Sequence, residues 1–339
     1  MWQPRDRSTL ALSQQAPTPF GPVTTRWARL RFLVTGALAG REQRGGAYNH
    51  AVAAPPVLGV QVRPVTAANY EAELDAIGSL LASYPIVAID MEYSGTVHRP
   101  PPGRSAAQLA PPEQYALVKA NADELTVVQL GLTLCDAYGN IPVALDDGGR
   151  PLEVAWEVTF SDFDARRDRH APESVEFLRS SGIDFDRSRA RGVASAAFAA
   201  KLAAVLSSAR EQRRGGELAW AAFGGAYDFA YLVKMLAGGR PLPGTWHAFA
   251  TQARALLGGR LFDAKYMAEH CERADLCGGL RRLAASLSVQ RTNSPEPPAA
   301  CLAGRKSHSA CRIYTAMRRR ILYRDGGASH QGLMDGLHH

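Results

Sequence analysis

Apolar residues in this chain of 339 form short continuous runs of the kind that make buried β-strands. These runs are rich in Val, Ile, Leu and aromatic residues, and turn residues flank them. A further run, LFDAKYMAEHC, begins as a strand and becomes helical. The clearest strand-like runs lie at residues 84–95 (YPIVAIDMEYSG), 125–137 (LTVVQLGLTLCDA), 155–164 (AWEVTFSDFD) and 218–223 (LAWAAF).

Between and around these runs, apolar residues recur at helical spacing. Residues 69–85 place Leu74, Ile77 and Leu81 on one face, and Pro85 ends that helix before the first clear strand. The prolines in 98–114 predict a surface loop. Further helices are expected at residues 113–125, 173–182, 194–210 and 227–239, and a strongly basic one is expected at 311–324 after a loop.

The order of these elements predicts a mixed α/β fold. The strands come first as an antiparallel group and then singly with helices between them, which favours a mixed sheet flanked by helices over a purely parallel sheet. Residues 1–61 are rich in Arg, Ala and Pro without an apolar period. They resemble either a transit peptide or a disordered tail, and we expect the disordered tail. The folded part is expected to span 62–325, followed by a flexible tail at 326–339.

The first strand-like run carries two carboxylates, Asp90 and Glu92, among apolar residues. In a strand, residues two apart project to the same face, about 6–7 Å apart along the chain. One interpretation is that the strand ends there and both acids are solvated. The other is a divalent-cation site, because two like charges on one face repel each other without a cation between them.

Asp228 supplies a third acid, at the start of a helix directly after the 218–223 run. A carboxylate there is often a helix cap or a partner of the helix dipole. Together with Asp90 and Glu92, however, it forms the beginning of a site for two Mg²⁺ or Mn²⁺ ions about 4 Å apart.

Composition changes this picture little. The net charge of +7 permits a polyanionic partner without requiring one. The five cysteines contain no C-x-x-C pair, so they signal neither a disulfide framework nor a zinc site. The longest apolar run near the N-terminus, residues 30–40, falls short of the ~20 residues that a membrane span needs, so no membrane association is expected.

Several long motifs, in order, resemble the poly(A)-specific ribonuclease subunit of the carbon catabolite repressor–NOT deadenylase complex in its plant form. They include IVAIDMEYSGTVHRP, NADELTVVQLGLTLCDAYGNIP, WAAFGGAYDFAYLVKML and LFDAKYMAEHC. The resemblance covers most of 62–325 and does not extend to the N-terminal tail.

The resemblance implies a ribonuclease H-like fold and a 3′-to-5′ exonuclease of the DEDD class. It implies that Asp90, Glu92 and Asp228 hold two divalent cations, Mg²⁺ or Mn²⁺, with poly(A) RNA as the substrate. The implied partners are the NOT scaffold subunit and a second nuclease subunit, and the implied localisation is the cytoplasm and nucleus.

The chain departs from the family where a general-base His precedes a fourth Asp by five residues. Aligned on AG-x-KSH, the His is His308, but the position of the Asp is Ile313 and about seven residues are lost. Aligned on Ala303-Gly304, Lys306 takes the place of the Asp. Asp325 is the next downstream acid and is expected to be solvated. Gly224 also stands where the family commonly has His, and Met91 stands where it has Thr.

Three hypotheses remain open. The first is an active exonuclease with His308 as general base. The second is a catalytically inactive member that acts as a binding or scaffold subunit. The third is a chain that lacks a short segment after His308. Loss of a metal ligand costs both metal affinity and geometry, so we expect an exonuclease with impaired activity.

Overall fold

A computed structural model describes residues 59–212, 216–289 and 302–338. Its centre is a seven-stranded mixed sheet in the order β1-β5-β3-β2-β6-β7, with β4 paired to β5. β2 pairs antiparallel with β3 and parallel with β6, and β1 is parallel to β5. The strands are β1 (Gly59–Val65), β2 (Ile86–Tyr93), β3 (Val127–Cys135), β4 (Val143–Leu145), β5 (Pro151–Thr159), β6 (Leu218–Ala222) and β7 (Gly259–Asp263).

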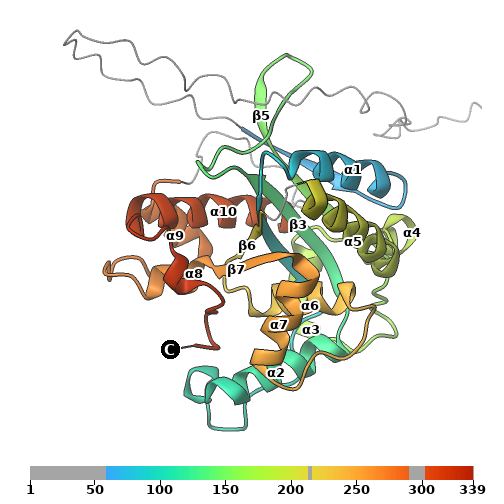
Figure 1. The fold of residues 1–339 in the computed structure, drawn as a ribbon. Helices are drawn as coiled ribbons and strands as arrows, with labels where there is room; N and C mark the ends of the chain where they lie inside the picture. The colour runs from blue at the N-terminus through green and yellow to red at the C-terminus, as the bar shows by residue number, and fades with distance from the viewer. Residues whose placement is uncertain (1–58, 213–215, 290–301, 339) are drawn as a thin grey trace, which may run out of the picture. The chain divides into compact units, whose positions relative to one another are not determined.

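Helices cover both faces of this sheet (Figure 1). The helix α10 crosses β5, β3, β2 and β6 on one face, while α1 and α5 pack together on the other. None of the described helices is long and apolar enough to cross a membrane. The helices are α1 (Tyr70–Leu80), α2 (Pro111–Glu124), α3 (Pro172–Ser180), α4 (Phe185–Arg191), α5 (Ser195–Gln212), α6 (Ala226–Leu236), α7 (Trp246–Leu257), α8 (Ala264–Glu269), α9 (Leu280–Ser286) and α10 (Leu302–Ala316), with short turns η2 (Ala106–Gln108), η3 (Met317–Ile321) and η4 (Ala328–His330).

The mixed sheet flanked by helices that the sequence predicts is confirmed. The apolar runs become β2, β3, β5 and β6, because β-branched and aromatic residues fill a sheet buried on both faces. All nine residues of β3 are buried, which explains why its run shows no polar alternation.

Two boundaries differ from those expected. The C-terminal residues 326–338, expected as a flexible tail, pack against the domain: Met334 is fully buried and Leu337 is 3% exposed. Gly332 N donates to Leu261 O at 2.9 Å, and Asp335 N donates to Asp263 Oδ2 at 3.0 Å. Of the expected disordered tail, residues 59–61 belong to β1, and residues 1–58 lie outside the described part of the chain.

The helix α10 begins at Leu302, nine residues before the basic helix that the sequence predicts. Two glycines allow it to lie directly on the sheet. A Cβ at Gly131 would lie 1.9 Å from Ala303 O, and one at Gly304 would lie 2.6 Å from Val62 Cγ1. Gly304 N also donates to Glu157 Oε2 at 3.0 Å. These contacts fix which residues of α10 face each strand.

Candidate active site

The structure brings Asp90, Glu92 and Asp228 together at the carboxyl end of β2. Asp90 and Glu92 lie on the face of β2 that α10 covers, and Glu92 is only 6% exposed. Asp228 lies in the first turn of α6, and its Oδ1 accepts a hydrogen bond from Met91 N at 2.6 Å. The backbone N–H of Met91, between Asp90 and Glu92, therefore holds Asp228 beside these two acids. The three acids form one cluster.

A fourth carboxylate fixes the turn that carries Asp228. Asp263, at the end of β7, is fully buried and accepts hydrogen bonds from Gly224 N at 2.8 Å and Gly225 N at 3.0 Å. Gly224 adopts φ +67°, which a residue with a side chain rarely does. The sequence analysis missed Asp263; its position directly after the strand-like LF of LFDAKYM was the available signal.

Burial raises the pKa values of the carboxyl groups in this cluster. It raises the pKa of Asp228 to about 7, and burial followed by the charge of Asp228 raises that of Asp90 well above its ordinary value. Burial also raises the pKa of Glu92, and it raises the pKa of Glu157, on strand β5, to about 7. An acidic cluster with these properties needs positive charge to ionise fully.

The positive charge comes from the protein itself. The Nζ of Lys306, on α10, lies 2.5 Å from Glu92 Oε1 and 3.9 Å from Asp90 Oδ2. Although burial opposes the charge of Lys306, Asp90 and Glu92 hold the pKa of its ammonium above the usual value. Lys306 is therefore a cation placed among the acids.

His308 lies elsewhere. Its Nε2 is 2.8 Å from Glu153 Oε2, and Arg312 pairs with the other oxygen of the same carboxylate. Glu153 lies on β5, four residues before Glu157. The structure thus places His308 in a buried ion-pair cluster and away from Asp90, which does not fit a general base at the acidic cluster.

The alignment on His308 is also wrong for a geometric reason. Contacts of Ala303 and Gly304 with Gly131 and Glu157 set the register of α10, and that register brings Lys306 to the acids. Ile313 is fully buried in the core rather than near the acids. The alignment on Ala303-Gly304 is the one that the packing supports.

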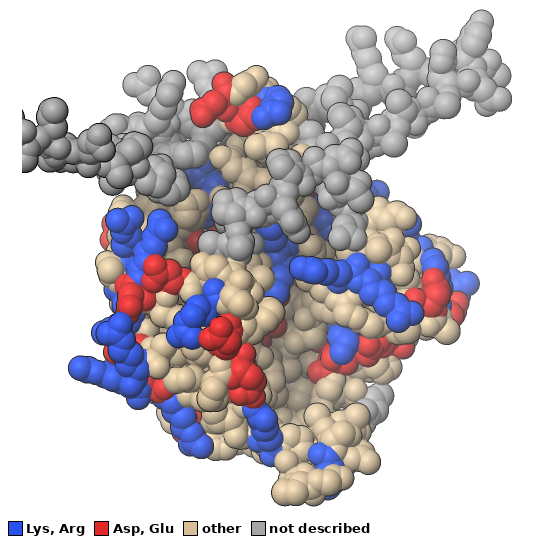
Figure 2. All heavy atoms as spheres, turned by 180° about the vertical axis from the view of Figure 1, so that it is seen from behind, with Lys and Arg blue, Asp and Glu red and all other residues tan. Residues whose placement is uncertain are grey.

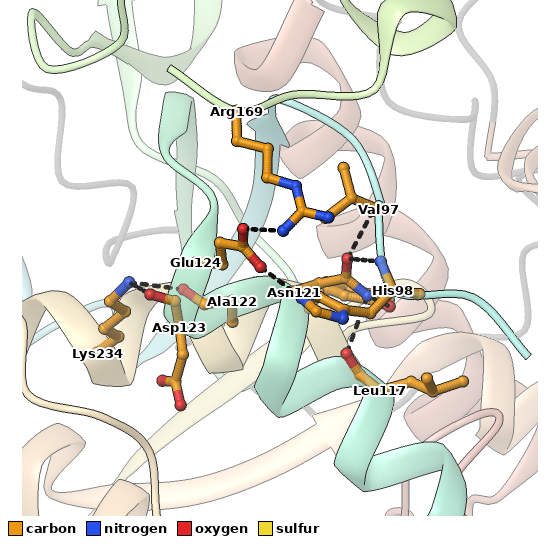
Figure 3. A network of polar contacts seen from close by, with 10 residues as sticks. Val97, His98, Leu117, Asn121, Ala122, Asp123, Glu124, Arg169 and Lys234 are labelled. Carbon is orange, nitrogen blue, oxygen red and sulfur yellow. Dashed lines mark hydrogen bonds and ion pairs between the residues drawn. The ribbon is translucent and has the colours of Figure 1, made fainter. Parts of the chain in front are cut away.

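Polar contacts hold the loop that follows β2 against α2 (Figure 3). Asn121, which has no exposed surface, accepts from Val97 N and His98 N at 2.7 and 2.9 Å and donates to His98 O at 2.8 Å. Glu124 pairs with His98 at 2.5 Å and with Arg169. The sequence analysis did not identify Asn121, since a polar residue in a helix has many ordinary explanations.

Aromatic side chains lie beside the acids. The ring of Tyr93, the residue after Glu92, stacks on Tyr227 at 5.3 Å and lies 4.9 Å from Tyr231. Burial raises the pKa of Tyr93 well above its usual value. These packed rings keep the end of β2 in place beside the first turn of α6.

A mixed sheet of this order, with a group of acids at the carboxyl end of its central strand, is that of a ribonuclease H-like fold. A family model for CAF1 family ribonuclease matches residues 65–214. The chain belongs to the CAF1 family of ribonucleases.

Relatives and solved structures support this assignment. The chain is 33% identical over 232 residues to the probable CCR4-associated factor 1 homolog 7 of Arabidopsis thaliana, covering 68% of this chain and 79% of that protein. It is 31% identical over 279 residues to the poly(A) ribonuclease pop2 of Schizosaccharomyces pombe, covering 80% of this chain and 75% of that protein. The structure of S. pombe Pop2p with Mg²⁺ and Mn²⁺ bound matches with a TM-score of 0.64 at 29% identity, over 81% of this chain and 99% of Pop2p.

The residues of this chain do not fit the metal pair that such a relative binds. Divalent cations of this type need oxygen ligands, and Lys306 presents an ammonium to Glu92 and Asp90. Within residues 59–212, 216–289 and 302–338, no group of three or more Asp, Glu, His or Cys side chains is arranged to hold a metal ion.

Proposed function

We propose that this chain is a subunit of a deadenylase complex that recognises poly(A) RNA, and that its 3′-to-5′ exoribonuclease activity is strongly impaired. Membership of the CAF1 family supports the ribonuclease class. A relative named poly(A) ribonuclease pop2 supports poly(A) RNA as the substrate. The position of Lys306 supports the impairment.

The physical argument rests on the salt bridge between Lys306 and Glu92. An ammonium 2.5 Å from Glu92 Oε1 occupies the side of the carboxylate that a divalent cation would need. Lysine carries three N–H donors and no acceptor, so it cannot replace a carboxylate ligand. Asp90, Glu92 and Asp228 together can offer oxygen ligands for one cation only if Lys306 moves away, and the family's fourth acid has no counterpart here.

The catalytically inactive alternative, a binding or scaffold subunit, rests on the same salt bridge. It differs from the first proposal only in whether any hydrolysis remains. The third hypothesis, a missing segment after His308, rests on the alignment on His308. The contacts of Ala303 and Gly304 with the sheet support the alignment on Ala303-Gly304 instead.

The experiment compares degradation of a labelled poly(A) oligonucleotide, with Mg²⁺ or Mn²⁺, by the natural chain, Lys306→Asp and Pop2p of S. pombe. We expect the natural chain to be at least about tenfold slower than Pop2p and Lys306→Asp to be faster than the natural chain, because the substitution restores an oxygen ligand. Lys201→Asp, which changes the same charge at a half-buried lysine paired with Asp75, serves as the matched control.

Each outcome decides between the hypotheses. A natural chain as fast as Pop2p would overturn the impairment. A Lys306→Asp variant that binds Mn²⁺ without gaining activity would favour the inactive binding subunit, since the metal site would then be restored without the chemistry. Equal gains in Lys306→Asp and Lys201→Asp would show that overall charge, and not the acid cluster, sets the rate.

The same proposal includes the partners and the location. One chain in a solved structure of the yeast NOT1 MIF4G domain co-crystallized with CAF1 has the fold of this chain. We propose a NOT scaffold subunit and a second nuclease subunit as partners, in the cytoplasm and nucleus. Co-purification of both subunits with a tagged chain, and imaging of a fluorescent fusion, test these points; exclusive recovery from an organelle would contradict them and favour a transit peptide at 1–61.

A further inference from the structure

A run of arginines follows the carboxyl end of α10. Arg318, Arg319 and Arg320 lie in η3, and each donates a hydrogen bond to a backbone carbonyl. The acceptors are Gly326 O at 3.1 Å, Tyr138 O at 2.5 Å and Leu287 O at 2.7 Å. These bonds orient the guanidinium groups without neutralising them, because a carbonyl carries no net charge. Each of the three therefore keeps a full positive charge.

Two tyrosines beside this run are largely solvent-exposed. Tyr138 and Tyr323 are 67% and 66% exposed, although a large aromatic ring normally gains by burial. The guanidinium of Arg319 lies 5.8 Å from the centre of the Tyr138 ring. The guanidinium of Arg318 faces inward, 5.5 Å from the centre of the ring of the buried Tyr314, whereas Arg319 and Arg320 are exposed. We call Arg319, Arg320, Tyr138 and Tyr323 the arginine–tyrosine surface.

Two aspartates lie in the adjoining loops and reduce the local charge. Asp136 accepts hydrogen bonds from Tyr138 N and Asn140 N, both at 2.8 Å. Asp325 accepts from Gly327 N at 2.8 Å and Ser329 N at 2.9 Å. Both carboxylates are thus turned into their own loops, while the arginines and tyrosines remain available to a partner.

This surface is remote from the acid cluster. Lys306 and Arg319 are thirteen residues apart along α10 and η3, which corresponds to roughly 20 Å at 1.5 Å per residue. The turn bearing Tyr138 follows Cys135, which pairs with Ile86 at the start of β2, whereas Asp90 and Glu92 lie near its end. The surface therefore forms no part of the candidate active site.

We propose that the arginine–tyrosine surface binds single-stranded RNA, with phosphates on the arginines and unpaired bases stacked on the tyrosines. Arginines supply the charge that phosphates require, and an exposed aromatic ring accepts any base because every base has a π-face. The net positive charge of the whole chain does not by itself create such a site, because basic and acidic side chains are interspersed on the face shown in Figure 2. The choice of RNA over other polyanions rests on the proposed function, but binding here requires no hydrolysis.

The test measures binding of a fluorescent adenosine oligonucleotide to the full chain by anisotropy, in EDTA, at several salt concentrations. We expect Tyr138→Ala to weaken binding about tenfold, which lies within the measured range for one lost stacking partner. We expect Arg319→Ala/Arg320→Ala to reduce the slope of log K against log salt by about 1.4, because each phosphate contact on single strands contributes about 0.7.

The matched control is Arg99→Ala/Arg166→Ala, which removes the same charge from two exposed arginines that pair with Glu173 and Asp186. An equal fall in slope for both pairs would overturn the proposal, because it would show that overall charge drives binding. Displacement of the RNA by polyglutamate, combined with no effect of Tyr138→Ala, would also overturn it and point to an acidic peptide. Because EDTA removes the metals, loss of nuclease activity leaves the result unaffected and the two proposals can fail separately.

Discussion

Glu153 and Glu157 lie four residues apart on β5, and both are buried beneath α10, yet their electrostatic states are opposite. Both oxygens of Glu153 are paired, one with His308 and one with Arg312, and despite burial these partners hold its pKa below the usual value. Glu157 lies near Glu92 and accepts hydrogen bonds from the uncharged donors Gly304 N and Gln129 Nε2. Burial raises its pKa to about 7, although the charge of Arg305 opposes the shift. The helix α10 therefore places enough positive charge beside Glu153 to keep its pKa low, and too little beside Glu157 to do the same.

The difference separates a structural ion-pair cluster from a site built around excess negative charge. The described part of the chain places one cation, Lys306, beside Asp90, Glu92 and Asp228, and Asp90 Oδ2 accepts no hydrogen bond from any residue there. Structural clusters satisfy their charges, whereas perturbed, incompletely satisfied carboxylates gather at functional sites. This contrast supports descent of the acid cluster from a cation-binding site.

The largest effect is expected when the satisfied cluster is broken. Glu153→Ala leaves His308 and Arg312 buried without their carboxylate, and removing one partner of a buried pair typically costs about 3–5 kcal/mol. Urea unfolding at pH 7 measures this loss. Glu157→Gln is the matched control on the same strand, and we expect it to leave stability unchanged or raised. A smaller loss of unfolding free energy for Glu153→Ala than for Glu157→Gln would contradict the contrast drawn between the two glutamates.

Stability against pH distinguishes the two glutamates next. The pKa of Glu157 is about 7 in the folded protein against an ordinary value of 4.5, so between these values the folded state holds a proton that the unfolded chain has lost. Stability therefore falls as pH rises from about 4.5 to about 7, by up to about 3 kcal/mol at about 1.4 kcal/mol per pKa unit. The lowered pKa of Glu153 acts oppositely: its contribution is present above 4.5 and is lost as pH falls below it.

Glu157→Gln should remove the part of the decline between pH 4.5 and 7 that Glu157 causes, while Glu153→Gln should leave that decline and lose the acid-side dependence. Free energies of unfolding measured in denaturant at each pH provide the check. An unchanged slope in Glu157→Gln would mean that Glu157 is ionised in the folded protein.

The sequence predicted the part of this architecture that depends on local pattern. The apolar runs of β2, β3 and β6 and the acids Asp90, Glu92 and Asp228 are visible because strand composition and charge spacing are properties of short segments. The start of α10 was predicted wrongly, since Gly304 and the prolines before Leu302 favour a loop. That helix depends on the close approach of Gly304 and Gly131, a contact between residues 173 positions apart that no local pattern reports.

The predicted position of His308 at the acids was wrong for the same reason, a contact between distant residues. A motif match gave its position in sequence, but the register of α10 on the sheet decides which side chain reaches β2, and that register follows from Ala303 and Gly131. The sequence offered Lys306 as an alternative without a means of choosing it.

Gly131→Ala tests that register directly, with a smaller effect than loss of an ion pair. Its Cβ would lie 1.9 Å from Ala303 O, so α10 must shift, and overpacking of this kind costs about 1–3 kcal/mol. Thermal unfolding reports the loss. The control is Gly279→Ala, where a Cβ meets nothing within 4 Å. Equal midpoints for the two variants would show that α10 does not lie against β3 as described.

The smallest effect is expected for Lys306→Met at pH 6, although it removes the one cation that the described residues place in the acid cluster. The pKa values of Glu92 and Asp90 are already raised, so these acids can take up a proton when the ammonium is lost, and we expect a cost of about 1 kcal/mol or less. Because ionisation becomes harder without Lys306, the cost should grow as pH rises from 6 to 8. Unfolding of Lys306→Met and of the control Lys201→Met at the two pH values measures this. A loss of 3 kcal/mol or more at pH 6 would show that Lys306 and Glu92 form a structural pair like that of Glu153, and the distinction between the two ends of β5 would fail.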